Sequence, residues 1–520
     1  MTESTSPPPG RANGNVVVVG AGPCGLAAAC ELLQNGVSVR VLEARKDRAV
    51  GSRAVQLWPS GLEVLRSIGV LDEAQRRGLR IHSNVYHLRD RLLTVVLGAA
   101  HEPLMLPQEQ TMELLEGALE RLGGRVERGV RVTAVEPTAT GVTAKAEGPG
   151  GVTELVHADW LIGADGVHSV VREQLGIDFP GNQLPLEFLL AEGRIDGDLR
   201  PGVMHYHLGP AGSAIVGPMP GGRVRVSGVL PPGFPLTAEA VQAFLDERTG
   251  GDLRVIELDT LATFATAERI AAVMRRGPVF LVGDAAHTHT PVGGQGLNLG
   301  LQDVHNLAWK LAGVINGRYA PVILDTYEPE RLQAARQIVG TTHRLIKMFT
   351  LGPIASRAQN LSWNLLGATG VLRRWFVPLL AGHRVGYPDA LLLAQDGGSG
   401  RWPRAGRRLR AALRPAGFGL PLPGARLPHW VPRAAPGTEA GFRLLTVGRA
   451  DSALAHRGRR LALAHGGAVC HEHHLRRTAS GFLLLRPDGY VAASGVEPAG
   501  LDRLERRLTH LIAAQETASA

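Results

Sequence analysis

A short β-α-β unit near the N-terminus is the feature that most constrains the fold. Residues 16–19 form an uninterrupted run of valines, residues 24–34 have the Ala/Leu-rich composition of a helix, and residues 37–42 alternate as a second strand. The turn between the first strand and the helix reads Gly20-Ala21-Gly22-Pro23-Cys24-Gly25, which matches G-x-G-x-x-G. Glycines at this spacing allow a tight turn, close approach of the backbone to a pyrophosphate and close helix packing. The pattern predicts a dinucleotide-binding domain.

The context of this glycine turn makes the prediction specific. With 66 glycines in 520 residues, three glycines at this spacing occur by chance roughly once, so the pattern alone carries little weight. Here it follows a valine strand and opens a helix, and Glu43 ends the second strand 43 − 20 = 23 residues after Gly20. An acid at this position is placed to accept hydrogen bonds from ribose hydroxyls. It favours FAD or NAD over a nucleotide with a 2′-phosphate.

The charge and cysteine content exclude several classes of protein. Lys and Arg exceed Asp and Glu by nine, but the excess is spread thinly, and the densest basic stretch, residues 401–410, lacks the interleaved aromatics typical of a nucleic-acid surface. Only three cysteines occur, which fits a reducing compartment. Neither a signal peptide nor an apolar run of about 18 residues is present. We therefore expect a globular cytoplasmic protein that binds neither nucleic acid nor membrane.

The pattern of elements changes along the chain and indicates about three domains. Parallel-sheet features persist to about residue 176, short alternating strands separated by Gly/Pro turns follow, and an apolar strand at 278–282 returns the chain to the first domain. The expected divisions are a flexible tail (1–14), a cofactor domain (15–180, of which about 81–105 can belong to the next domain), an antiparallel substrate domain (181–272), the returning cofactor domain with connecting helices (273–395) and a C-terminal domain (396–520).

Two further motifs lie at strand ends. Asp165-Gly166 follows the apolar strand at 160–164, and Gly283-Asp284 follows the strand at 278–282. The second motif precedes Pro291-Val292-Gly293-Gly294-Gln295-Gly296-Leu297-Asn298, a glycine loop that runs into a helix. The N-terminus of a helix presents unpaired N–H groups and a positive dipole end, which stabilise negative charge on a reduced flavin ring.

These three motifs, in this order over residues 15 to about 345, resemble the group A FAD-dependent aromatic hydroxylases, the para-hydroxybenzoate hydroxylase-like family. The segments 423–429 and 485–491 are similar to the larger, polyketide-tailoring members, which carry a C-terminal thioredoxin-like domain. Many of those members have an aromatic-Arg pair where this chain has Ala492-Ala493. The resemblance implies an α/β (α+β) protein with a Rossmann-like FAD domain, an inserted antiparallel-sheet substrate domain and a thioredoxin-like C-terminal domain.

The resemblance also implies the residues that bind FAD. Glu43 would hold the adenosine ribose, Arg53 the phosphates, Gln108 the ribityl chain or ring, and Asp284 the ribityl hydroxyls, while Asp165 would serve both FAD and NADPH. The full expected set is Gly20, Gly22, Pro23, Gly25, Glu43, Ala44, Arg45, Arg53, Gln108, Asp165, Gly283, Asp284, Pro291, Gly294, Gly296, Leu297 and Asn298.

The reaction implied by the family is hydroxylation of a phenolic or polycyclic aromatic, polyketide-like substrate. NADPH or NADH would reduce FAD, O2 would add at the flavin C4a, and the C4a-hydroperoxyflavin would deliver its distal oxygen. Because the cofactor carries this chemistry, no catalytic triad is required. The catalytic residue is unknown, with His289 and Pro291 as candidates beside the flavin loop. Candidate substrate contacts are Tyr86, His205, Tyr206, His207, Arg225 and His289.

Several alternatives remain open at this stage. The same flavin chemistry would support Baeyer-Villiger oxygen insertion, and a flavin-free NAD-dependent oxidoreductase or a non-catalytic flavin protein would share the glycine turn. A flavin-dependent halogenase is disfavoured, because none of the seven tryptophans stands two residues from another. We expect no metal site, since His465, His471, His473 and His474 lack a trusted ligand spacing. With Cys470 as its only cysteine, the C-terminal domain is expected to be structural or dimer-stabilising, in a monomer or a homodimer.

Overall fold

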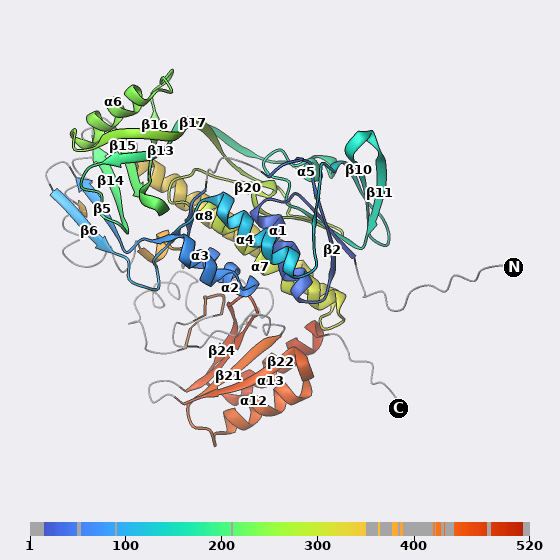
Figure 1. Ribbon diagram of the computed structural model, residues 1–520. Coiled ribbons are helices and arrows are strands. Elements are labelled where there is room, and N and C mark those ends of the chain that lie inside the picture. Colours follow the sequence, from blue (N-terminus) through green and yellow to red (C-terminus); the bar gives the residue numbers. More distant parts are fainter. Residues whose placement is uncertain are drawn as a thin grey trace.

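The computed structural model describes most of the chain and shows a mixed α/β architecture (Figure 1). The described residues are 15–48, 54–88, 91–209, 212–349, 362–363, 377–382, 385–387, 420–421, 423–427, 431, 441–475 and 480–512. Arg53, one of the expected cofactor residues, and the expected tail 1–14 lie outside them. Within the described part, no helix is both long enough and apolar enough to cross a lipid bilayer.

A six-stranded sheet with the order β18-β19-β12-β1-β2-β8 forms the centre of the first domain. Its strands are β1 (Asn15–Val19), β2 (Ser38–Glu43), β8 (Val126–Arg128), β12 (Trp160–Gly163), β18 (Arg275–Arg276) and β19 (Val279–Leu281). All neighbours pair in parallel except β18 with β19. Residues 16–18 of β1 are almost fully buried, which explains why the central strand is a run of β-branched residues.

Helices and two small sheets surround this centre. Helix α1 (Pro23–Gln34) packs against α4 (Gln108–Arg121) and α7 (Gly296–Ile315). Its Pro23 occupies a first-turn position where no N–H is required, and its alanines permit close helix packing. The other helices here are α2 (Pro59–Ile68), α3 (Leu71–Arg77), α5 (Val170–Gln174) and α8 (Tyr327–Phe349). One small sheet consists of β9 (Arg131–Pro137), β10 (Val142–Glu147) and β11 (Thr153–Ala158). The other consists of β3 (Gln56–Leu57), β7 (Leu104–Met105) and β4 (Leu79–Arg80).

An eight-stranded sheet with the order β20-β17-β13-β16-β15-β14-β5-β6 forms the second unit. Its strands are β5 (Ser83–Leu88), β6 (Arg91–Val96), β13 (Gly181–Asp196), β14 (Val203–Gly209), β15 (Gly212–Pro218), β16 (Val224–Leu230), β17 (Arg254–Ile270) and β20 (His287–Thr288). Neighbours pair antiparallel except β14 and β5, which are parallel. Residues 83–96 thus join this sheet from the N-terminal part of the chain.

The two faces of the eight-stranded sheet have different partners. Helix α6 (Ala238–Thr249) covers one face (Figure 1), where its Phe244 and Leu245 pack against Val216 and Val226. The opposite face carries Tyr206 and belongs to a separate apolar cluster that includes Val292 of the glycine loop at 291–298. Because side chains alternate across a strand, strands β13, β15, β16 and β17 contribute to both clusters. The second face is therefore the one turned toward the expected cofactor.

The C-terminal part forms a separate lobe, shown in orange and red in Figure 1. It contains a four-stranded sheet with the order β22-β21-β23-β24, built from β21 (Phe442–Val447), β22 (Val469–His474), β23 (Gly481–Leu485) and β24 (Val491–Gly495). Helices α12 (Ala453–Ala464) and α13 (Pro498–Leu511) accompany it. Strands β21 and β22 are parallel and the other pairs are antiparallel.

Candidate active site

The glycines of the turn between β1 and α1 differ in the space around them. Gly20 and Gly25 leave no room for a Cβ atom, whereas Gly22 borders open space. A Cβ atom at Gly20, where φ is +102°, would lie 2.5 Å from the carbonyl oxygen of Ala164, and one at Gly25 would lie 1.9 Å from that of Gly20. At Gly22 a Cβ atom would meet nothing within 4 Å. Gly22 caps α1, and no side chain there caps the helix N–H groups. The turn therefore presents an open helix N-terminus of the kind that binds phosphate.

Glu43 is held against this turn by two backbone hydrogen bonds. Its Oε2 accepts from the N–H of Ala21 at 2.7 Å, and its Oε1 accepts from the N–H of Arg45 at 2.9 Å. The carboxylate thus lies at the carboxyl end of β2, where open α/β sheets bind ligands. Ala44 beside it is half-buried, and Arg45 is exposed at the edge of the turn.

Asp165 accepts hydrogen bonds from the start of the short helix α5, whose N-cap is Ser169. Its Oδ1 accepts from the hydroxyl of Ser169 at 2.6 Å, and its Oδ2 accepts from the N–H of Val171 at 3.0 Å. Burial raises the pKa of the Asp165 carboxyl, while the hydrogen bond from Ser169 opposes this shift. Both carboxylate oxygens therefore already serve the turn at the end of β12.

Asn298 joins the glycine loop to the segment before α2. Its Oδ1 accepts from the N–H of Trp58 at 2.7 Å, and its Nδ2 donates to the carbonyl oxygens of Gln56 at 2.9 Å and Gly294 at 2.8 Å. The indole N–H of Trp58 also donates to the carbonyl of Gly293 at 2.8 Å. The Asn298 side chain is 1% exposed, so it acts here as a buried clamp. The sequence interpretation considered only its backbone.

The other expected flavin-loop residues lie at the edges of this clamp. Pro291, Gly296 and Leu297 are half-buried, and Gly296 contributes to the first turn of α7. Gln108 begins α4, and its N–H donates to the carbonyl of Ala54 at 3.2 Å. Three distant segments, around residues 56, 108 and 294, are therefore brought into one region by backbone contacts.

Gly283 and Asp284 follow β19 at the same edge of the central sheet. The N–H of Gly283 donates to Oδ2 of Asp303 at 2.9 Å, whereas Asp284 is exposed. A Cβ atom at Gly283, where φ is +61°, would lie 2.8 Å from the sulfur of Cys24. This glycine therefore permits close contact between the loop and the start of α1.

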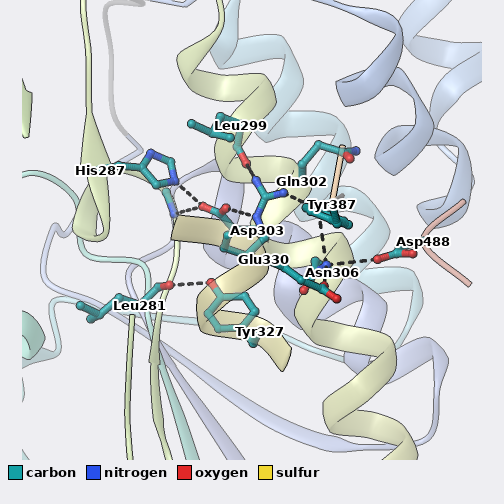
Figure 2. Close-up of polar contacts among 12 residues, drawn as sticks. Leu281, His287, Leu299, Gln302, Asp303, Asn306, Tyr327, Glu330, Tyr387 and Asp488 are labelled. Atoms are coloured by element: carbon teal, nitrogen blue, oxygen red, sulfur yellow. Dashed lines mark hydrogen bonds and ion pairs between the residues drawn. The ribbon is translucent and has the colours of Figure 1, made fainter. Parts of the chain in front are cut away.

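Asp303 is the centre of a buried network that the sequence reasoning missed (Figure 2). Its Oδ2 also contacts Nε2 of His287 at 2.7 Å, and its Oδ1 accepts from Nε of Arg331 at 2.6 Å. Arg331 donates in turn to the hydroxyl of Tyr387 at 2.7 Å. Burial alone would raise the pKa of Asp303, but the attraction of His287 and Arg331 holds it below its usual range. His287, Arg331 and Tyr387 are separated in sequence from Asp303, so no local motif predicts that they meet.

A second buried group connects the helices of the first domain to the C-terminal lobe. Glu330 accepts from Nζ of Lys310 at 2.8 Å and from Arg486 at 2.6 and 2.9 Å. Nδ2 of Asn306 donates to Glu330 at 2.8 Å and to Asp488 at 3.2 Å, the contact visible in Figure 2. Burial would raise the pKa of Glu330, but Arg486 and Lys310 lower it to about 2. The lobe therefore docks on the first domain through buried charges that are paired with one another.

The structure places the expected substrate residues on two opposite faces of the eight-stranded sheet. Tyr86 and Tyr206 stack at a centroid distance of 4.9 Å on the face that also packs against Val292 of the glycine loop. His205 and His207 alternate with Tyr206 and therefore lie on the α6 face. Residues of these two sets cannot line the same substrate surface.

Arg225 shares the tyrosine face but is already paired. Its Nε donates to Oε1 of Glu192 at 2.5 Å, and the two residues are opposite each other on β16 and β13. Burial lowers the pKa of Arg225, and the attraction of Glu192 opposes this effect. The pair thus places two compensating charges at one end of an otherwise apolar and aromatic surface.

His289 lies next to the first turn of α7. Its Nδ1 contacts the carbonyl oxygen of Thr290 at 2.6 Å, and a Cβ atom at Gly296 would lie 3.3 Å from its Nε2. That buried Nε2 has no hydrogen-bond partner among the described residues. Burial lowers the pKa of His289 to about 4, so the imidazole is neutral near pH 7.

The open α1 N-terminus, the carboxylate at the end of β2 and the glycine loop before α7 together fit a dinucleotide that carries a ring system. The fold and site thus define a flavin-binding α/β protein with an added sheet facing the cofactor. Residues 13–342 match the family described as FAD binding domain, and the chain belongs to this family of flavin-dependent monooxygenases.

Similar proteins cover nearly the whole chain. The 12-dehydrotetracycline 5-monooxygenase/anhydrotetracycline 6-monooxygenase of Streptomyces rimosus subsp. rimosus is 34% identical over 514 residues, covering 94% of this chain and 97% of that protein. The structure of the OxyS anhydrotetracycline hydroxylase from Streptomyces rimosus matches with a TM-score of 0.72 and 29% identity, covering 96% of this chain and 99% of the other. The complex of aklavinone-11 hydroxylase with FAD and aklavinone matches with a TM-score of 0.70 and 26% identity, covering 96% and 100%.

Proposed function

We propose that this chain is an FAD-dependent, NAD(P)H-consuming monooxygenase that hydroxylates a phenolic ring of a polycyclic, polyketide-like aromatic substrate. The aromatic face of the eight-stranded sheet carries this proposal. Tyr86 and Tyr206 stack on it, Trp363 meets Tyr86 edge-on at 4.9 Å, and Val292 connects it to the glycine loop. These side chains are buried in one apolar cluster, whose aromatic composition suits contact with a flat, apolar ring system. The names of the relatives, which refer to anhydrotetracycline and aklavinone, support the same substrate class.

The chain's own residues fit FAD as the cofactor. The open space at Gly22 and the first turn of α1 would hold the pyrophosphate, and the fixed carboxylate of Glu43 would accept hydrogen bonds from the adenosine ribose. When bound, FAD would accept hydride from NAD(P)H and activate O2 at its C4a position. The N-terminus of α7, behind Gly294 and Gly296, would stabilise negative charge on the ring.

The described side chains near this surface orient and enclose a substrate rather than take its proton. Burial raises the pKa of Tyr206 to about 12 and that of Tyr86 well above its usual range, so both hydroxyls stay protonated near neutral pH. The low pKa of His289 leaves a neutral imidazole near the flavin loop. The apolar cluster around these residues excludes water, which protects a reactive oxygen species from side reactions.

For the C-terminal lobe we propose a thioredoxin-like fold with a structural role. Strand β21, helix α12 and the parallel strand β22 form a β-α-β unit, and the antiparallel strands β23 and β24 extend the sheet. Cys470 is exposed on β22 and is the only cysteine of this region, so no dithiol pair supports disulfide exchange. The buried contacts of Arg486 with Glu330 support a docking role instead.

The test is the visible spectrum of the purified protein followed by anaerobic addition of NADPH or NADH. We expect flavin bands at about 370 and 450 nm, and flavin reduction that a polycyclic phenol accelerates more than a single-ring phenol or a saturated analogue. Under 18O2 the product should gain one labelled oxygen, and its NMR spectrum distinguishes a new hydroxyl group from a ring-inserted ester. A protein that binds no flavin after reconstitution, or whose reduction no aromatic compound accelerates, contradicts the proposal.

A further inference from the structure

Three histidines cluster on the α6 face of the eight-stranded sheet, away from the proposed substrate surface. His205 and His207 stand two residues apart on β14, and His87 pairs with His207 across the parallel strands β5 and β14. Each of the three can offer one ring nitrogen such that all three nitrogens lie within 4.8 Å of one another. The group joins segments 118 residues apart, so its members share no local sequence motif.

The three imidazole rings lie close to the arrangement that they would have around a bound metal ion. Nε2 of His87 lies 2.9 Å from Nδ1 of His205, and the rings of His87 and His207 stack at a centroid distance of 3.9 Å. Zinc is bound by imidazole nitrogens at about 2.0–2.1 Å, which in a tetrahedral site puts two nitrogens about 3.3 Å apart. The 2.9 Å separation of the first pair of nitrogens is close to this value, and all three nitrogens lie within 4.8 Å of one another. Small side-chain movements would therefore bring the three nitrogens around one ion.

A buried polar atom without a hydrogen-bond partner provides independent support for an ion at this cluster. Nε2 of His205 is buried and has no hydrogen-bond partner among the described residues. A buried polar atom without a partner needs an explanation, and an ion that reorients the ring is one.

We propose that His87, His205 and His207 bind one divalent transition-metal ion of the zinc type, with water in the remaining position. The ion would connect β5 to β14, the two strands of this sheet that pair in parallel. The opposite face of the same strands carries Tyr86 and Tyr206. The metal therefore has a structural role. It cross-links the two strands and fixes the position of the two stacked tyrosines without contacting the substrate. This inference stands whether or not the proposed hydroxylation is correct.

The experiment uses the full-length, FAD-loaded protein without an affinity tag, stripped with a chelator and titrated with Zn2+ by calorimetry. We expect one Zn2+ per chain, and a His207→Asn change should weaken its binding about 100-fold or more. His473→Asn is the control, because His473 also lies on a strand but is half-buried and contacts Thr446 and Gly448 in the C-terminal lobe. This control should bind Zn2+ as the unchanged protein does.

A second measurement does not depend on the folding of a variant. One equivalent of Cu2+ added to the unchanged protein should give an electron paramagnetic resonance spectrum with coupling to three imidazole nitrogens. The flavin spectrum and circular dichroism of each variant show whether it has folded. The proposal is overturned if the unchanged protein binds Zn2+ only at millimolar concentrations, if a folded His207→Asn variant retains full affinity, or if His473→Asn abolishes binding.

Discussion

Replacing Gly22 with alanine should separate cofactor binding from folding. Gly22 has φ −71° and ψ 177°, which alanine adopts readily, and its Cβ atom would meet nothing within 4 Å. The loss of chain freedom in the unfolded state stabilises by about 0.4–1 kcal/mol, and a poorer N-cap costs a similar amount. The free energy of unfolding of the apoprotein should therefore change by less than about 1 kcal/mol.

Cofactor affinity should respond very differently to the same methyl group. It would occupy the open space in which we propose that the α1 N–H groups bind the FAD phosphates, and each charge-assisted hydrogen bond contributes about 1.5–3 kcal/mol. Losing two of them, about 3–6 kcal/mol, weakens FAD binding by about 150- to 20,000-fold. Flavin fluorescence titration of the apoprotein measures the affinity, and thermal unfolding followed by circular dichroism measures stability.

Gly25→Ala provides the contrasting control. Its Cβ atom would lie 1.9 Å from the carbonyl oxygen of Gly20, a backbone atom that cannot move without distorting the turn. This variant should lose stability already as an apoprotein. The reasoning is refuted if Gly22→Ala binds FAD within about threefold of the unchanged protein, or if its apoprotein is destabilised as strongly as that of Gly25→Ala.

Three other predictions concern stability and reactivity. Asn298→Ala removes a side chain that makes three buried hydrogen bonds and should lower the free energy of unfolding by about 2–4 kcal/mol in urea titration; a loss below about 0.5 kcal/mol would contradict the clamp. Glu330 has its pKa lowered from 4.5 to about 2 on folding, so its contribution, on the order of 3 kcal/mol, is present above pH 4.5 and is lost as the pH falls toward 2. A Glu330→Gln variant should show a flatter decline over that range, and an unchanged decline would count against this assignment. With an aromatic disulfide reagent, the native protein should show one fast thiol, the exposed Cys470, because burial raises the pKa values of Cys24 and Cys30; a second fast thiol would be inconsistent with this packing.

The β-α-β unit illustrates what local sequence can predict. A valine run, a glycine turn and an Ala-rich helix each have one favourable structure, and the predicted elements at 16–19, 24–34 and 37–42 agree with β1, α1 and β2 to within one residue at either end. The family resemblance is confirmed by the match over residues 13–342. The predicted elements depend on contacts between residues close in sequence, and the family resemblance depends on motifs whose spacing the fold fixes.

The candidate substrate surface shows what the sequence could not supply. The alternation of a strand places His205 and Tyr206 on opposite faces, so the sequence analysis was wrong to include both among the substrate contacts, and the strand pattern could have shown this. It did not indicate which face turns toward the glycine loop, because that depends on the position of α6 and on pairing with β5 from a distant segment. The Asp303 network is of the same kind, since its partners meet only through tertiary packing.

Through the two buried networks, the C-terminal lobe helps to hold the loop that contains Gly283 and Asp284. Undocking the lobe would remove Arg486 from Glu330, and breaking a buried ion pair by removing one partner costs about 3–5 kcal/mol. Glu330 is adjacent in sequence to Arg331, whose guanidinium holds the carboxylate that fixes the N–H of Gly283. A shift of the first turn of α8 would therefore disturb both the docking contact and the loop that carries Asp284. The position of the proposed ribityl-binding residue thus depends on a lobe that contributes none of the flavin contacts predicted from the sequence.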